Sequence, residues 1–190
     1  MIKIAIFASG SGSNAENIFQ YFKNHPSIQV SCLLSNKQDA FVLERAKKWQ
    51  IPIYTFSKAD LYENGRVAEI LEKEQIDSIV LAGFLWLIPS WMIEMYPQKI
   101  INIHPALLPQ YGGKGMYGMK VHQAVWENKE AFTGITIHYA NAVYDEGEVI
   151  FQAKVALSSE DKPETIAEKV HQLEYKYFPK VVEQVLTQSS

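Results

Sequence analysis

MIKIAIFASGSGSN, which occupies residues 1–14, is the stretch of sequence that decides the fold. Its first part, Ile2–Ala8, is a short apolar run with β-branched side chains, and this composition is typical of a buried β-strand. The loop Ser9–Asn14 follows directly, and apolar residues at helical spacing begin at Asn14. A strand, a glycine-rich turn and a helix in that order predict the start of a βαβ unit.

The same alternation of short apolar runs and amphipathic stretches continues along the chain. It predicts strands at Ile2–Ala8, Gln29–Leu34, Ile53–Phe56, Ser78–Ala82 and Ile100–Ile103, and helices at Asn14–Lys23, Ala40–Trp49 and Arg66–Lys73. Strands that alternate with helices form right-handed crossovers on a parallel sheet. We therefore expect an α/β fold, a doubly wound and mostly parallel sheet flanked by helices on both faces, which is a Rossmann-like arrangement.

The pattern changes after Pro105. Residues 105–119 have no clear period and are predicted to form a long loop, a kind of segment that is more often functional than idle. The elements expected beyond it are strands at Thr133–Ala140 and Glu148–Ala156, a turn at Tyr144–Gly147 and a helix at Pro163–Leu186. Pro179 is expected to kink or interrupt that helix. Since no linker or repeat is visible, residues 1–190 are predicted to form a single domain.

Composition narrows the class of protein. The chain has 190 residues, of which 47% are apolar and 21% charged, with a net charge of -3. These values are typical of a globular protein and leave no basic field for nucleic acid. No apolar run is long enough to cross a bilayer and no cleavable signal is visible, so we expect a cytoplasmic protein that binds no membrane. Cys32 is the only cysteine and is read as a small buried hydrophobe.

The glycine loop predicts an anion site. Gly12, Ser13 and Asn14 stand where a helix begins, and free backbone N–H groups at a helix N-terminus suit a phosphate. The alternative is a serine that caps the helix at a tight turn that binds no ligand. Gly10-x-Gly12-x-x-Ala15 also fits a dinucleotide fingerprint, but the second strand ends in Ser35-Asn36-Lys37 without the acid that would hold a ribose. A lone phosphate is therefore favoured over a nicotinamide cofactor.

Asn102 and His104 form the second candidate site. They share one face of a strand that ends just before the long loop, and ligands of open α/β sheets bind at such strand ends. Histidine can carry a proton at neutral pH, and an asparagine amide can donate a hydrogen bond to an oxyanion. Taken alone, the pair is more simply read as a polar strand end that neighbouring backbone satisfies.

An ordered set of motifs changes that interpretation. The set comprises Ser9–Asn14, Leu34-Ser35-Asn36-Lys37, Ala82-Gly83-Phe84, Asn102–Pro109, Gly134–His138, Asp145 and Val149–Val155. It covers most of the chain and resembles the folate-dependent formyltransferases, most closely the branch that acts on 5'-phosphoribosylglycinamide in de novo purine (IMP) synthesis. The resemblance implies a formyltransferase that takes its formyl group from 10-formyltetrahydrofolate, uses no metal and works as a monomer or homodimer.

The resemblance also implies roles for individual residues. The catalytic residues would be Asn102, His104 and Asp145, with His138 as a supporting residue; the phosphate would bind Gly12, Ser13 and Asn14, the glycinamide Glu174, and the folate Leu85, Trp86, Leu87, Ile88, Asn102, Ala140, Asn141, Tyr144 and Asp145. Phosphate binding is thus expected in about residues 1–100, and folate binding and catalysis in about residues 101–190. Read without the resemblance, residues 84–88 are plain core and Glu174 lies on a surface helix.

The implied chemistry is direct acyl transfer. The substrate amine attacks the formyl carbon, and Asn102 and a protonated His104 would stabilise the resulting oxyanion. Asp145 would raise the pKa of His104 and relay protons through water. No comparable role is predicted for His25, His122 or His171.

Three features depart from the family pattern. The loop at residues 110–120 is longer than in compact members, so that Lys114, Met116 or Tyr117 could reach the substrate; Glu146 replaces a glycine; and Trp86 stands where arginine is usual.

Four other functions are alternatives to this one. A formyltransferase acting on methionyl-tRNA would need a further basic domain, and a formyltetrahydrofolate hydrolase an N-terminal regulatory domain. Outside formyl chemistry, the alternatives are a phosphate-binding module that catalyses no reaction and a nicotinamide-dependent oxidoreductase.

Overall fold

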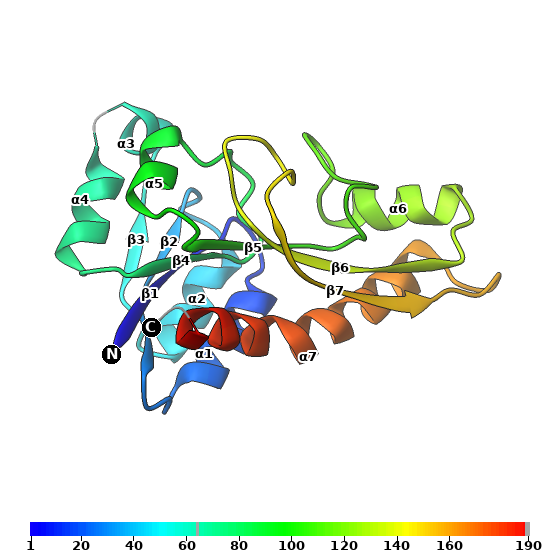
Figure 1. The fold of residues 1–190 in the computed structure, drawn as a ribbon, viewed down its shortest axis with the longest axis horizontal. Coiled ribbons are helices and arrows are strands. Elements are labelled where there is room, and N and C mark those ends of the chain that lie inside the picture. Colours follow the sequence, from blue (N-terminus) through cyan, green and yellow to red (C-terminus); the bar gives the residue numbers. More distant parts are fainter. Residues whose placement is uncertain (64, 189–190) are drawn as a thin grey trace.

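One mixed sheet organises the molecule (Figure 1). The computed structural model describes residues 1–63 and 65–188, so the end of the predicted domain, residues 189–190, lies outside the described residues. The strands are β1 (Ile2–Phe7), β2 (Ile28–Ser35), β3 (Ile53–Thr55), β4 (Ser78–Leu81), β5 (Ile100–His104), β6 (Phe132–Tyr139) and β7 (Val149–Ala156). They lie in the order β3-β2-β1-β4-β5-β6-β7. The first five run parallel, whereas β6 and β7 are antiparallel additions at one edge.

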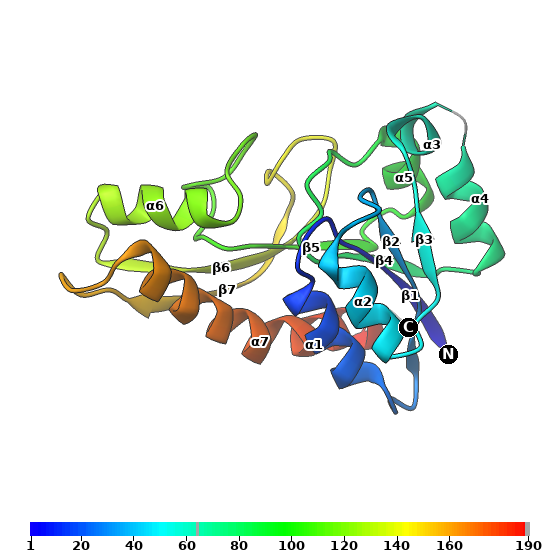
Figure 2. The same cartoon turned by 180° about the vertical axis from the view of Figure 1, so that it is seen from behind.

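Helices cover both faces of this sheet. They are α1 (Ser13–Phe22), α2 (Phe41–Lys48), α3 (Lys58–Tyr62), α4 (Arg66–Lys73), α5 (Ser90–Met95), α6 (Met119–Glu127) and α7 (Pro163–Gln188). One buried cluster joins α1, α2, α6 and α7 to the sheet, and a second joins α3, α4 and α5 to the opposite face. Figure 2 shows α1, α2 and α7 side by side. The predicted fold class is confirmed.

The first strand illustrates why there are two cores. Ile4 and Ile6 belong to one buried cluster, while Ala5 and Phe7 belong to the other. Successive side chains of a strand point to opposite faces, so a continuous apolar run serves a sheet that helices cover on both sides.

Several local details differ from the sequence-based expectations. Helices α3, α5 and α6 were not predicted; α3 and α5 are short, with five and six residues, and α6 directly follows the long loop. A capping box formed by Ser57 and Asp60 begins α3. The expected interruption at Pro179 is wrong, because α7 continues through it to Gln188. In the part of the chain that the structure describes, no helix is both long and apolar enough to span a membrane.

Candidate active site

A cleft opens at the carboxyl ends of the parallel strands. It has a volume of about 580 Å³ and is lined by residues of the glycine loop, of the segments that follow β4 and β5, and of the β6–β7 connection. Strand order reverses beside β1, and such a switch point leaves room for a ligand outside the strand ends. All fifteen residues to which the resemblance assigns a role line this one cleft.

The glycine loop forms one wall of the cleft. Gly12 holds the N-cap position of α1 in a left-handed conformation with φ 76°, and no side chain bonds to the first turn of the helix. A Cβ atom at Gly12 would lie 2.1 Å from Cγ2 of Val42, so glycine is required there. The hydroxyl of Ser9 donates to Oδ1 of Asn36 at 2.6 Å and accepts from the Leu85 N–H at 3.1 Å. The interpretation as a serine cap is therefore wrong, and the N–H groups of the first turn are left free of side-chain partners.

A buried carboxyl group stands beside this helix start. Nδ2 of Asn14 donates to Oε2 of Glu174 at 2.9 Å. Glu174 is only 5% exposed, so its interpretation as a surface-helix residue is wrong. Burial raises the pKa of Glu174 to about 7, against a smaller lowering by the Asn14 hydrogen bond. Oδ1 of Asn14 is buried and has no partner among residues 1–63 and 65–188, which leaves an acceptor that a ligand can satisfy.

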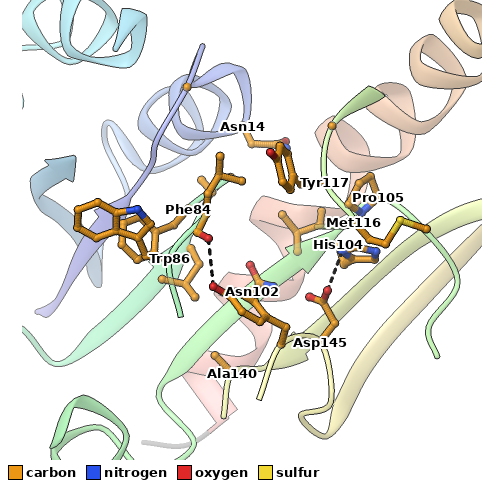
Figure 3. A pocket seen from close by; sticks show the side chains of 18 of the residues that line it. Asn14, Phe84, Trp86, Asn102, His104, Pro105, Met116, Tyr117, Ala140 and Asp145 are labelled. Carbon is orange, nitrogen blue, oxygen red and sulfur yellow. Dashed lines mark hydrogen bonds and ion pairs between the residues drawn. The ribbon is translucent and has the colours of Figure 1, made fainter. Parts of the chain in front are cut away.

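The second wall brings Asn102, His104 and Asp145 together, as Figure 3 shows. Nδ1 of His104 lies 3.4 Å from Oδ2 of Asp145. His138 stands directly opposite Asn102 in the antiparallel pair of β5 and β6, and Nδ2 of Asn102 lies 3.0 Å from Nε2 of His138. The same Nε2 atom is 3.6 Å from Oδ1 of Asp145. His138 therefore links the amide to the carboxylate.

Hydrogen-bond partners define the protonation of these rings. Nδ1 of His138 lies 2.9 Å from the carbonyl oxygen of Tyr139, so this nitrogen carries a proton, and Nε2 of the same ring faces both Nδ2 of Asn102 and Oδ1 of Asp145. Nε2 of His104 donates to the carbonyl oxygen of Tyr111 at 2.7 Å. Since Asp145 is also an acceptor, both nitrogens of His104 face groups that favour its protonated form.

Burial opposes that protonation. It lowers the pKa of His104, and although Asp145 and the Tyr111 carbonyl raise it, the net shift is downward. We expected Asp145 to raise this pKa; the interaction has that sign, but desolvation outweighs it. Burial also raises the pKa of Asp145, yet the His138 hydrogen bond, the His104 charge and the Gly113 N–H together hold it below its usual value. Asp145 is therefore ionised beside a histidine that resists charging.

The turn that carries Asp145 has little freedom to vary. Asp145 itself is left-handed, with φ 58°, and Oδ2 accepts from the Gly113 N–H at 3.0 Å. A Cβ atom at Gly147 would lie 1.6 Å from the carbonyl oxygen of Tyr139. The substitution at Glu146 therefore leaves intact the glycine on which the turn depends.

The third wall is apolar. Ile88 is 4% exposed and belongs to the core, whereas Leu85 is 36% exposed and faces the cleft. The interpretation of residues 84–88 as plain core is thus right for Ile88 and wrong for Leu85. Trp86 packs edge-on against Phe56 with ring centroids 6.0 Å apart, and Nζ of Lys58 lies 5.7 Å from the Trp86 ring. These contacts hold a flat aromatic surface at the cleft.

Sequence reasoning missed two histidines of the cleft. His122 and His171 both line it, with ring centroids 6.5 Å apart, and Nε2 of His171 is 3.9 Å from Oε2 of Glu174. His25, in contrast, pairs with Glu183 outside the cleft. Nothing in the local sequence distinguishes the three, because only the packing of α6 against α7 brings His122 and His171 to the site.

Known proteins are similar in sequence to this chain over most of its length. Residues 2–182 match a family model described as formyl transferase. The chain belongs to the formyl transferase family. It is 39% identical over 186 residues to the chloroplastic phosphoribosylglycinamide formyltransferase of Arabidopsis thaliana, which covers 95% of this chain and 64% of the relative. It is 36% identical over 192 residues to the phosphoribosylglycinamide formyltransferase of Bacillus subtilis, which covers 98% and 95% of the two chains.

Solved structures of the formyl transferase family share the fold. A phosphoribosylglycinamide formyltransferase from Anaplasma phagocytophilum superposes with a TM-score of 0.88 at 29% identity, over 98% of this chain and 88% of the other. One from Bacillus halodurans gives a TM-score of 0.87 at 33% identity, over 99% and 97%. The chain spans 64% and 60% of the length of two plant relatives that it matches. The predicted family is confirmed.

Proposed function

We propose that this chain transfers the formyl group of 10-formyltetrahydrofolate to the amine of 5'-phosphoribosylglycinamide, giving the N-formyl product and tetrahydrofolate, in purine biosynthesis. One observation carries the proposal: a phosphate cradle at Gly12 and the group of Asn102, His104 and Asp145 line the same cleft. The names of the relatives support the same acceptor and the same transferred group. Membership of the formyl transferase family by itself implies a small-molecule acceptor and a folate-type formyl donor.

The glycine loop would hold the phosphate of the acceptor. The free N–H groups at the start of α1 and the hydroxyl of Ser13 are donors, and the positive end of the helix dipole favours an anion. The unpartnered Oδ1 of Asn14 would accept from a hydroxyl or amide of the same substrate. Glu174, which Asn14 already contacts, would bind the glycinamide. The substrate amine is then directed towards Asn102 and His104.

The apolar wall fits the folate. Leu85 and Trp86 present exposed apolar surface, and the turn containing Ala140, Asn141 and Tyr144 faces the same space. A flat heteroaromatic ring needs such walls, together with backbone donors and acceptors at its edge. When bound, 10-formyltetrahydrofolate supplies the formyl carbon that the amine attacks.

Asn102 and His104 would stabilise the negative oxygen that develops on the formyl carbon. The amide nitrogen of Asn102 has two hydrogens, and only one of them can point at Nε2 of His138, so the other can donate to the oxyanion. His104 resists charging, because burial lowers its pKa. A developing negative charge reverses that balance, so the charged histidine is favoured most where the reaction needs it.

Asp145 would complete the proton path. Its carboxylate faces both His104 and His138, and the Gly113 N–H holds it in place. The amine must lose a proton as it attacks, and the folate nitrogen must gain one as it leaves. A carboxylate beside a histidine can pass that proton by way of water.

The direct test is a formyl-transfer assay with 5'-phosphoribosylglycinamide and 10-formyltetrahydrofolate, in which both products are quantified. We expect stoichiometric N-formyl product and tetrahydrofolate. Asn102→Asp retains the size of the side chain but removes the donor, and serves as a matched variant. Release of free formate without N-formyl product would indicate a hydrolase instead. Binding of both ligands without turnover would indicate a binding module.

A further inference from the structure

The cleft is poor in permanent positive charge. Among its lining residues, Lys114 is the only lysine or arginine, whereas Asp145 and Glu174 supply two carboxyl groups. A phosphate monoester carries close to two negative charges at neutral pH, and a helix N-terminus offers only about half of one positive charge. The proposed phosphate site is therefore short of charge unless Lys114 contributes.

Lys114 is available for such a role. It forms no hydrogen bond or ion pair with any residue in the ranges 1–63 and 65–188. A lysine that faces a cleft without a partner can pair with a ligand anion without first breaking a contact of its own. The ligand's charge would instead replace solvent around the ammonium group.

The chain that follows Lys114 approaches the start of α1. Figure 3 shows the side chain of Tyr117 next to Asn14, and that of Met116 next to His104, whereas Trp86 lies on the opposite side. Met116 and Tyr117 thus lie near His104 and near the start of α1, respectively. Lys114 lines the same cleft and precedes by three positions the tyrosine that lies next to Asn14.

Two glycines allow the segment to adjust. Gly113 and Gly115 flank the lysine with φ values of 91° and 89°, a left-handed conformation that favours glycine. A Cβ atom at either position would meet nothing within 4 Å, so the surrounding space is open. The Gly113 N–H nevertheless anchors the start of the segment to Asp145 at 3.0 Å. Lys114 therefore sits on an adjustable turn fixed at its catalytic end.

We propose that Lys114 is a phosphate-binding residue, which supplies the full positive charge that the glycine loop lacks. This inference rests on the proposed function for the identity of the substrate, but its ligand chemistry, a phosphate monoester on a ribose, is independent of formyl transfer. Lys120 offers a matched control, because its Nζ already lies 4.8 Å from the Tyr117 ring on the same stretch of chain.

The experiment compares Lys114→Ala, Lys114→Arg and Lys120→Ala with the unmodified chain. Binding of ribose 5-phosphate and of ribose is measured by calorimetry, and KM is measured for both substrates of the transfer reaction. We expect Lys114→Ala to weaken ribose 5-phosphate binding and raise KM for 5'-phosphoribosylglycinamide by about 10- to 100-fold, the usual effect of losing a charged hydrogen bond. KM for 10-formyltetrahydrofolate should stay unchanged, Lys114→Arg should restore most of the affinity, and Lys120→Ala should change it by less than about threefold.

Three results would overturn the inference: unchanged ribose 5-phosphate affinity in Lys114→Ala, an equal loss in Lys120→Ala, or a rise confined to the KM for folate. The last would assign the lysine to the folate carboxylates. If the chain binds ribose 5-phosphate through Lys114 but forms no formylated product, the inference stands and the proposed function fails. If it formylates normally without Lys114, the reverse holds. Circular dichroism of each variant confirms that the fold is retained.

Discussion

The two halves of the chain bury different kinds of polar side chain. Among residues 1–63 and 65–95, the buried polar residues are all serines: Ser9, Ser31, Ser35 and Ser78. From β5 onward they are three histidines, two acids and two threonines: His104, His122, Thr133, Thr136, His138, Asp161 and Glu174. The parallel half thus offers a rigid backbone and neutral hydroxyl groups, while groups that can gain or lose a proton are concentrated in the half that contains the antiparallel strands.

Sheet architecture explains this division. Strands β1, β2 and β4 have helices on both faces, where an unpaired charge costs several kcal/mol. At the other edge, the antiparallel partner β6 places His138 opposite Asn102 and Thr136 opposite His104. Polar side chains there can satisfy one another across the strands. The comparison predicts that loss of a proton-transferring side chain in the second half alters catalysis, whereas truncation of a buried apolar side chain in the first half alters stability.

The largest effect is expected from His104→Ala. Loss of this acid–base group should reduce formyl transfer by about two to four powers of ten, with a smaller effect on substrate binding. Single-turnover kinetics and ligand binding by calorimetry distinguish the two. Near-normal turnover would remove His104 from the mechanism, and with it the main reason to assign chemistry to the second half.

Ile6→Ala tests the prediction that truncation in the first half of the chain alters stability. Ile6 is fully buried in the parallel half, and such truncations lower the free energy of unfolding by about 2–5 kcal/mol. Denaturant titration measures the loss, and kcat at a temperature where the variant is folded should be nearly unchanged. The exposed Val149 supplies a control, for which Val149→Ala should cost less than about 0.5 kcal/mol. A selective loss of kcat in Ile6→Ala would break the comparison.

Asp145→Asn is expected to reduce transfer by about one to two powers of ten, less than His104→Ala, since Asp145 acts through the histidine. Asp145 raises the pKa of His104, so removing its charge should lower that pKa further. Nuclear magnetic resonance of the histidine rings measures the change directly. An unaltered His104 titration would show that the 3.4 Å contact does not tune the ring.

Glu174→Gln has the smallest expected effect. The effect is a change in how the thermal stability of the protein depends on pH. Burial raises the pKa of Glu174 from 4.5 to about 7, so its stabilising contribution is complete below pH 4.5 and is lost as pH rises through 7. The neutral glutamine should therefore raise Tm at pH 8 and change it little at pH 4.5.

Glu183 provides a control of opposite sign. Hydrogen bonds from Tyr21 and His25 lower its pKa, so its contribution is present above its unfolded value and lost as pH falls. Glu183→Gln should therefore lower Tm at pH 8. If both variants shifted Tm in the same direction, the pKa of Glu174 would not be raised.

Much of the fold follows from short-range patterns. The strands around Ile4 and Ile79, and the helix at Arg66–Lys73, are encoded by the period of their apolar residues, which is a property of a dozen neighbouring positions. Helix α6, which directly follows the long loop, was missed. The ordered motifs around Asn102 and Asp145 were sufficient to identify the family, because such a set rarely occurs by chance.

The sequence by itself determined the strand–loop–helix start, the glycine-rich turn before α1, and the type of side chain available for catalysis. Only the tertiary structure decided which of those side chains meet. Asn14 and Glu174 are 160 positions apart and touch because α7 packs against α1. Desolvation, which raises the pKa of Glu174 and lowers that of His104, likewise depends on every element packed around the group. Local propensity acts between neighbours in the chain, whereas burial and charge act between neighbours in space.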